Sequence, residues 1–258
     1  MDIGMLGRFF GRHTGGNWRP PAQELAFAAQ SGFDTVQIRS DRPGELEDEL
    51  GIAAQELGAL YDELGVEPVL ELLVRHECER GTFARALRAS LPAIEAAGFL
   101  RVHVHPVGPA EAAPFLRDDL AEALALAGEA ELIFGVEHNA PGHRLLVDPA
   151  EIEALLEAVP GLGFVWDVNH TPAEHVERFL ALRERFTLVH VSDTPLPETN
   201  HHLPLGRGSV DFSVLAGIDD VPLILEIGGL PHSGGPGLDT DDALLDSRAR
   251  LAVPAGHA

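Results

Sequence analysis

The chain has 258 residues, of which 45% are hydrophobic, and its 41 acidic and 18 basic residues give a net charge of −23. This composition predicts one globular unit with a large core, and its charge repels nucleic acid phosphates. All basic residues are arginines and Cys78 is the one cysteine, which excludes the lysine chemistry of Schiff-base aldolases, pyridoxal-phosphate enzymes and P-loops, and an intramolecular disulfide framework.

Eight short apolar runs recur along the chain and predict eight β-strands. They cover residues 2–6, 34–38, 67–72, 101–106, 132–139, 163–168, 187–193 and 222–229. Helical patterns lie between most of them, with apolar residues spaced by three or four. The clearest predict helices over 45–65, 81–98 and 171–186, and Thr171-Pro172 is a suitable start for the last.

Strands that alternate with helices over this length are typical of a (β/α)8 TIM barrel. We expect a single barrel domain over residues 1–252 and a disordered tail over 253–258. A doubly wound open sheet is the alternative. Its first strand normally leads into a glycine-rich dinucleotide-binding turn, and the glycines of residues 7–16 lack that spacing.

Four polar residues lie at or near the ends of the last four predicted strands. They are Glu137, Asp167, His190 and Glu226, separated by 30, 23 and 36 residues. In a barrel the C-terminal ends of neighbouring strands converge on one mouth. Three carboxylates placed there repel one another unless a proton or a cation lies among them. Oxygen ligands with one imidazole suit Mn, Mg, Co or Zn, so we expect these residues to bind one divalent metal ion.

The segments around these residues resemble a known family, the xylose isomerase-like sugar isomerases and epimerases, which share their barrel with apurinic-site endonucleases. The resemblance runs through VEHN (136–139), DVNHT (167–171), VHVSD (189–193), HLPLGRGSVDF (202–212) and LEIGG (225–229). It implies a metal-dependent isomerase or epimerase of sugars or sugar phosphates. It also implies that the four residues above are the metal ligands, and that Glu137 and Glu226 are catalytic, acting on substrate protons from the two faces of one carbon.

Such an enzyme removes a proton from a carbon next to a carbonyl group. A metal polarises the oxygen and stabilises the enediolate, while one glutamate takes the proton and another group returns it. Epimerisation follows if two glutamates act on opposite faces. Isomerisation follows if the same proton returns to the neighbouring carbon, and the sequence leaves both open.

Four further residues are predicted to contact substrate. They are His105, His170, His202 and Arg207. In the family the positions of His170 and His202 line the pocket. His105 alternates with His103 along the fourth strand, so both face one side and His103 lies deeper. Arg207 lies between two glycines and is suited to a substrate oxygen or phosphate. A helix cap at His170 and a solvated loop at Arg207 are the structural alternatives.

Three positions depart from the family pattern. Gln37 stands where the second strand often carries a glutamate, Glu71 where the endonucleases have a histidine, and Asn200 where they have an aspartate. Those endonucleases use three zinc ions, so we expect this chain to lack a ligand for two of them. The alternatives to an isomerase are a dehydratase of the keto-inositol or dehydroshikimate type, an apurinic-site endonuclease-like hydrolase, and a barrel that binds a small molecule without catalysis.

The N-terminus has no apolar region behind a basic start, and no apolar run approaches membrane-spanning length. We therefore expect a cytoplasmic protein with a small-molecule carbohydrate substrate and neither nucleic acid nor membrane as a partner. Family members are commonly dimers or tetramers, so a homo-oligomer is one alternative for the assembly.

Overall fold

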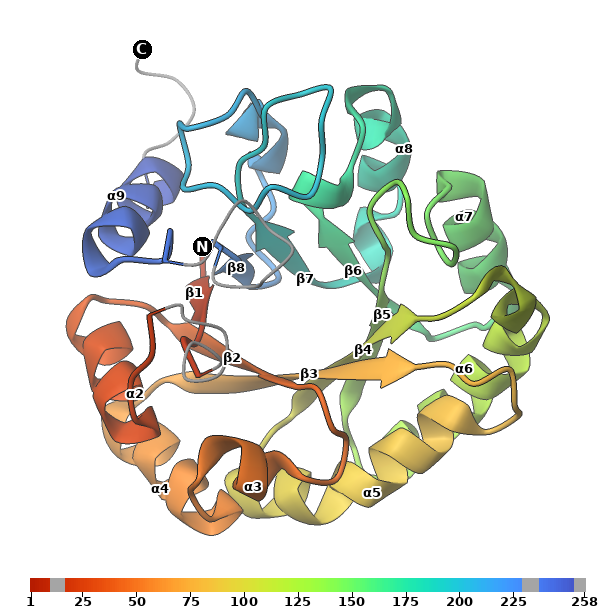
Figure 1. Ribbon diagram of the computed structural model, residues 1–258, viewed down its shortest axis with the longest axis horizontal. Helices are drawn as coiled ribbons and strands as arrows, with labels where there is room; N and C mark the ends of the chain where they lie inside the picture. Colours follow the sequence, from red (N-terminus) through yellow and green to blue (C-terminus); the bar gives the residue numbers. More distant parts are fainter. Residues whose placement is uncertain (10–16, 229–236, 253–258) are drawn as a thin grey trace.

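The structure is a computed structural model that describes residues 1–9, 17–228 and 237–252 (Figure 1). Eight strands form a closed barrel in which each strand pairs in parallel with its neighbours in the sequence, and the last pairs with the first. Helices form a ring around this barrel. The predicted (β/α)8 architecture is therefore confirmed, while the predicted tail 253–258 lies outside the described residues.

All eight predicted apolar runs contain a strand. The strands are β1 (Ile3–Leu6), β2 (Thr35–Ser40), β3 (Glu67–Arg75), β4 (Arg101–Val107), β5 (Ile133–Glu137), β6 (Gly163–Asp167), β7 (Phe186–Val191) and β8 (Leu223–Leu225). The largest extension is at β3, which continues three residues beyond the predicted 67–72 because its last residues pair with β4, Arg75 opposite Val107.

The α-helices from α2 to α8 lie in connections between strands, and α9 follows β8. They are α2 (Pro21–Gln30), α3 (Leu46–Leu50), α4 (Ala54–Leu64), α5 (Thr82–Ala97), α6 (Ala113–Glu129), α7 (Pro149–Ala158), α8 (Val176–Leu180) and α9 (Asp241–Ala252). Within the described part of the chain, no helix combines the length and the apolar character needed to cross a membrane. The cytoplasmic location stays a prediction.

Two of the three predicted helices are shorter than the sequence pattern indicated. The pattern over 45–65 is divided because Gly51 adopts a left-handed φ of 70° and ends α3. Over 171–186 only α8 is α-helical. Thr171 does not start it, because the Thr171 hydroxyl donates a hydrogen bond to the carbonyl oxygen of Asp167 and stays with the end of β6. The third prediction, 81–98, is confirmed as α5.

The interior of the barrel is layered. One layer is a fully buried apolar group in which β3, β6, β7 and β8 each contribute one residue; these are Val69, Val165, Leu188 and Ile224. Side chains two residues apart on a strand point to the same side. The next residues inward along the same four strands are Glu71, Asp167, His190 and Glu226. A polar layer therefore lies directly above the apolar one, towards the C-terminal ends of the strands.

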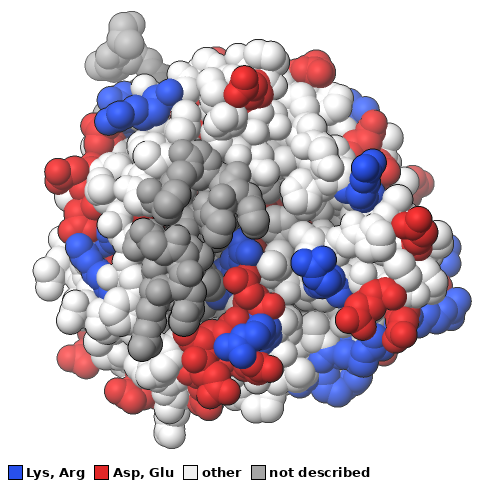
Figure 2. Space-filling view, in the orientation of Figure 1, with Lys and Arg blue, Asp and Glu red and all other residues white. Residues whose placement is uncertain are grey.

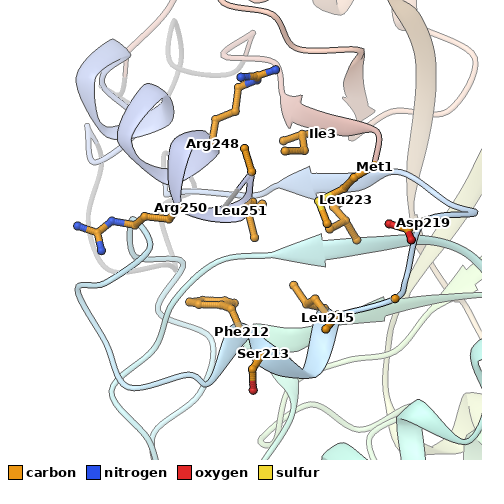
Figure 3. A pocket seen from close by; sticks show the side chains of 13 residues that line it. Met1, Ile3, Phe212, Ser213, Leu215, Asp219, Leu223, Arg248, Arg250 and Leu251 are labelled. Atoms are coloured by element: carbon orange, nitrogen blue, oxygen red, sulfur yellow. The ribbon is translucent and has the colours of Figure 1, made fainter. Parts of the chain in front are cut away.

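The connection between β7 and β8, residues 192–222, contains a short 3-10 turn (Phe212–Leu215) in place of an α-helix. Beside it lies a hollow of about 690 Å³, lined by apolar side chains that include Leu215, Leu223 and Leu251 (Figure 3). Ile3 also lines it, so the hollow opens near the N-terminal ends of β1 and β8. It lies at the end of the barrel opposite the polar layer.

Acidic and basic side chains mix on the outer surface. Figure 2 shows carboxylates and guanidinium groups next to one another around the rim of the face drawn in Figure 1. Many are paired, as are Arg178 with Glu153 at 2.8 Å and Arg250 with Asp246 at 2.9 Å. Such exposed pairs contribute little to stability.

Close packing at the start of β6 gives a test of the barrel. A Cβ atom at Gly163 would overlap the Thr187 side chain and lie 2.7 Å from the carbonyl oxygen of Phe134. We expect Gly163→Ala to lower the free energy of unfolding by about 1–3 kcal/mol. Gly128, within α6, has no atom within 4 Å of such a Cβ, so Gly128→Ala should raise stability by up to about 1 kcal/mol. Urea denaturation of both variants measures this, and equal effects would contradict the packing.

Candidate metal centre

The four side chains predicted to bind a metal ion come together inside the C-terminal end of the barrel. One ligand atom from each of Glu137, Asp167, His190 and Glu226 lies within 4.8 Å of the others. All four residues are buried. Nδ1 of His190 lies 3.3 Å from Oε1 of Glu137 and 3.3 Å from Oε2 of Glu226. The structure thus brings these residues together as the strand order predicts, and their assignment as ligands stays a prediction.

The hydrogen bonding of these four residues also fits a bound divalent cation. Each carries a buried atom that accepts or donates no hydrogen bond within the described structure: both Oε atoms of Glu137, Oδ2 of Asp167, Nδ1 of His190 and Oε2 of Glu226. Buried polar atoms without partners are rare, because desolvating them costs free energy. Carboxylate oxygens with one imidazole nitrogen are a donor set that divalent cations bind.

Burial and neighbouring charges shift the pKa values of this cluster strongly. Burial raises the pKa of Glu226 well above its usual range and also raises that of Asp167. Burial acts the same way on Glu137, but the charges of His105 and His190 outweigh it and hold the Glu137 pKa well below its usual range. Burial disfavours protonated His190, yet Glu137 and Glu226 raise its pKa to about 10. Bound protons thus offset the cluster's negative charge, and a cation there would replace them.

Gln37, on β2, fixes the orientation of the His190 ring. Oε1 of Gln37 lies 2.8 Å from Nε2 of His190, and Nε2 of Gln37 donates a hydrogen bond of 3.0 Å to Oε2 of Glu71. A carboxylate accepts only from the NH2 end of the amide, so the oxygen end faces His190, which must donate from Nε2. Nδ1 is thereby left to face Glu137 and Glu226 as the ligand atom.

Among the described residues, three further groups of possible ligands share carboxylates with this centre. They are His103, Glu137 and His190; Asp167, His170 and His202; and Glu71, His105 and Glu137. Nε2 of His170 lies 3.1 Å from Oδ2 of Asp167, and Nδ1 of His105 lies 3.2 Å from Oε2 of Glu137. The expectation that this chain lacks a ligand for two of the three ions stays a prediction, although Glu71 offers an oxygen where the endonucleases have a histidine.

The three histidines predicted to contact substrate surround the centre, and they differ in the direction of their pKa shifts. Burial lowers the pKa of His170 to about 3 and also lowers that of His202. For His105 burial acts in the same direction, but Glu137 and Glu71 outweigh it and raise its pKa well above the usual range. His105 is therefore held as a cation beside two carboxylates, whereas His170 and His202 are neutral. Nδ1 of His170 donates to the carbonyl oxygen of His138, so its Nε2 offers a lone pair. Both ring nitrogens of His202 are already hydrogen-bonded, to the Glu226 carbonyl oxygen and to Asn200.

Arg207 is the predicted site residue that the structure does not bring to the centre. It is exposed, and the pocket next to the centre is not lined by it. Its loop is organised by Asp193, whose carboxylate accepts hydrogen bonds from the backbone N–H groups of Thr194, Gly206, Gly208 and Val210. A Cβ at Gly208 would collide with this carboxylate, so the two glycines serve the loop. A substrate contact by Arg207 stays a prediction.

A pocket of about 310 Å³ opens directly onto the centre. Its lining combines charged, histidine and apolar side chains from several strand ends; they are Arg39, Leu73, Arg75, His105, Val107, His143, His170, Asn200, His202 and Glu226. Sequence reasoning missed Arg39 and Arg75. The signal that identifies them is the alternation along β2 and β3, which puts Arg39 on the side of Gln37 and Arg75 on the side of Glu71.

Residues 25–243 match the family described as Xylose isomerase-like TIM barrel. No curated protein matches the chain. Among solved structures, D-allulose 3-epimerase from Methylomonas sp. has 18% identity and a TM-score of 0.77, with 97% of this chain and 96% of that chain covered.

Two other solved structures carry different names. The probable 3-DHS dehydratase of Bacillus anthracis has 16% identity and a TM-score of 0.73, covering 98% of this chain and 99% of that one. An AP endonuclease of family 2 from Brucella melitensis has 15% identity and a TM-score of 0.69, covering 95% and 97%. At these identities the likeness establishes the fold and not the reaction.

Binding of a cation can be tested with an isosteric variant of Asp167. Its Oδ1 accepts the backbone N–H of Asn169, whereas Oδ2 has no hydrogen bond. Asp167→Asn keeps that acceptor and removes the charge. We expect Mn²⁺ at 100 times its Kd to stabilise the wild-type protein by about 2.7 kcal/mol and to stabilise Asp167→Asn far less. Thermal unfolding measures both, with the exposed Asp211→Asn as control. Equal stabilisation of Asp167→Asn and wild type would contradict a site at Asp167.

The contact between Gln37 and His190 generates a second test. We expect Gln37→Leu to weaken Mn²⁺ binding by about 10- to 100-fold, because the His190 ring loses the acceptor that fixes it. Competition with a chelator measures the Kd, and Gln55→Leu on the exposed side of α4 is the control. An unchanged Kd in a folded Gln37→Leu protein would show that another contact orients the ring.

Proposed function

We propose a function for this chain, which belongs to the xylose isomerase-like TIM-barrel family. It is an isomerase or epimerase of a keto sugar or keto-sugar phosphate that depends on one divalent metal ion. The observation that carries this proposal is the placement of Glu137 and Glu226, both 3.3 Å from Nδ1 of His190. They come from β5 and β8, three strands apart around the closed barrel. In this proposal one of these glutamates acts on each face of the reacting carbon.

The roles of the residues follow from this arrangement. The cation, held by Glu137, Asp167, His190 and Glu226, supplies a Lewis acid for negative charge on substrate oxygens. One of the two glutamates takes the proton from the carbon next to the carbonyl group. The other glutamate returns a proton on the opposite face for epimerisation. Isomerisation needs the same proton to return to the neighbouring carbon.

The histidines at the mouth hold the substrate in this proposal. Neutral His170 accepts a hydrogen bond from a substrate hydroxyl group at Nε2, because its Nδ1 donates to the carbonyl oxygen of His138. The ring nitrogens of His105 and His202 already bind protein groups, so these two rings pack against the substrate. Oδ1 of Asn139 lies 2.9 Å from Nε2 of His105 and fixes that ring.

Two alternatives within the same barrel have support of their own. The groups around His170 and His105 are further possible ligand sets that share Asp167 and Glu137 with the first, and metal pairs are typical of phosphodiester hydrolysis. This favours an endonuclease-like hydrolase, although a net charge of −23 opposes DNA binding. A dehydratase would use the same centre and expel water after the proton is removed. A barrel that binds without catalysis is the third alternative.

The proposed reaction is tested by hydrogen exchange from solvent. We expect the metal-loaded protein to introduce deuterium from D2O next to the carbonyl group of a keto sugar or its phosphate, as seen by NMR. Glu137→Gln and Glu226→Gln should each lower the rate at least about 100-fold, because each removes a group that transfers protons. Glu63→Gln, on the exposed side of α4, is the matched control.

The products and the metal content separate the alternatives in the same experiment. About one bound ion and retention of all substrate atoms support an isomerase or epimerase. Loss of water from the substrate supports a dehydratase, and two or three bound ions with strand cleavage at an abasic site support a hydrolase. Absence of exchange with every keto sugar and phosphate would overturn the proposal.

A further inference from the structure

We propose that the pocket above the candidate metal centre takes a substrate with an anionic group, a phosphate or a carboxylate, at the end remote from the reacting carbon, and that Arg75 binds this group. The inference rests on the proposed function for the orientation of the substrate. It deepens that function by naming the substrate class.

The charge of the pocket wall is the first observation. The chain has 41 acidic and 18 basic residues, so a wall of average composition would be acidic. Among the described residues that line the pocket, Glu226 is the one carboxylate, and it belongs to the centre at the floor. Arg39 and Arg75 both line the remaining wall. The pocket therefore reverses the sign of the molecule around it, which favours an anionic ligand.

The order of side chains along β3 is the second observation. Glu71, Leu73 and Arg75 alternate along the strand and share one side. Glu71 contributes to a ligand group beside the centre, while Leu73 and Arg75 line the pocket above it. Four residues of strand span about 13 Å, so the side chain of Arg75 leaves β3 well beyond the candidate metal centre. A substrate bound at the floor of the pocket passes the apolar side chain of Leu73 before it reaches the guanidinium group of Arg75.

The neighbouring strand β4 contributes the next part of the pocket wall. Leu73 pairs with His105 and Arg75 pairs with Val107 in the register of β3 and β4. His105, level with Leu73, and Val107, level with Arg75, both line the pocket. Leu73 and Val107 thus offer apolar contact to the carbon chain of a sugar, with the His105 ring beside them.

The two arginines differ in what already neutralises them. Nε of Arg39 lies 2.7 Å from Oδ1 of Asp41 and 4.0 Å from Oε1 of Glu71, so its charge serves the protein's own carboxylates. Arg75 is exposed, and its guanidinium group forms no hydrogen bond or ion pair with any residue that the structure describes. A guanidinium can donate two parallel hydrogen bonds to a phosphate or a carboxylate. Arg75 is therefore the group at the rim that remains to bind an anion.

The test compares D-ribulose 5-phosphate, D-ribulose and a keto-sugar acid of similar length on the metal-loaded protein by calorimetry. We expect the phosphate or the acid to bind about 10- to 100-fold more tightly than the free sugar, as charge-assisted hydrogen bonds allow. The tighter of the two anions identifies the group. Arg75→Gln should lower the affinity for the anionic ligand and so abolish this preference. Arg88→Gln, an exposed arginine on α5 outside the pocket, should retain it.

Kinetics give a second readout. Because Arg75 lies far from the reacting carbon, Arg75→Gln should raise KM for the anionic substrate and leave kcat for deuterium exchange within about twofold. Equal binding of free and anionic sugars, or a preference that survives in Arg75→Gln, would overturn the inference. Exchange with free D-ribulose would still support the proposed function in that case. A preference that depends on Arg75, without exchange in any substrate, would support the anion site and overturn the proposed function.

Discussion

Burial of like charges in one layer of the barrel is the constraint on which the rest of this site depends. Glu71, Glu137, Asp167 and Glu226 all lie inside, each with 4% exposure or less. Carboxylates so close cannot all stay ionised in a medium of low dielectric unless positive charge lies among them. The barrel meets this with histidines on β4 and β7 and with protons, and the same arrangement suits a divalent cation.

The apolar layer beneath explains why the charges cannot relax towards water from below. Val69, Val165, Leu188 and Ile224 fill the barrel two residues before the polar groups. The polar side chains of this layer must therefore find their hydrogen-bond partners within the layer or towards the mouth of the barrel. This explains chains of contacts such as that from His190 through Gln37 to Glu71. The apolar layer thus explains why the polar side chains above it hold one another in fixed positions.

The sequence was sufficient for the strands and for the four residues at their ends, because both depend on local pattern and on strand order. It was insufficient where contacts depend on register between strands. Gln37 contacts His190 across 153 residues, and no spacing rule indicates that pair. Gly51 and Thr171 show a second limit. Helical periodicity continued past both, yet a left-handed backbone at one and a hydrogen bond back to β6 at the other decided where helices could form.

The carboxylate of Asp193 has a consequence for the long connection after β7. Four backbone amides between residues 194 and 210 donate to this single side chain. They are therefore tied into the body of the protein although 192–209 holds no helix, and they belong with the slowly exchanging amides of the barrel rather than with those of surface loops. The carboxylate of one buried residue, Asp193, thus accepts the backbone hydrogen bonds that the carbonyl groups of a helical turn accept elsewhere. The backbone of Asp193 also pairs with that of Leu203, the residue after His202, in both directions.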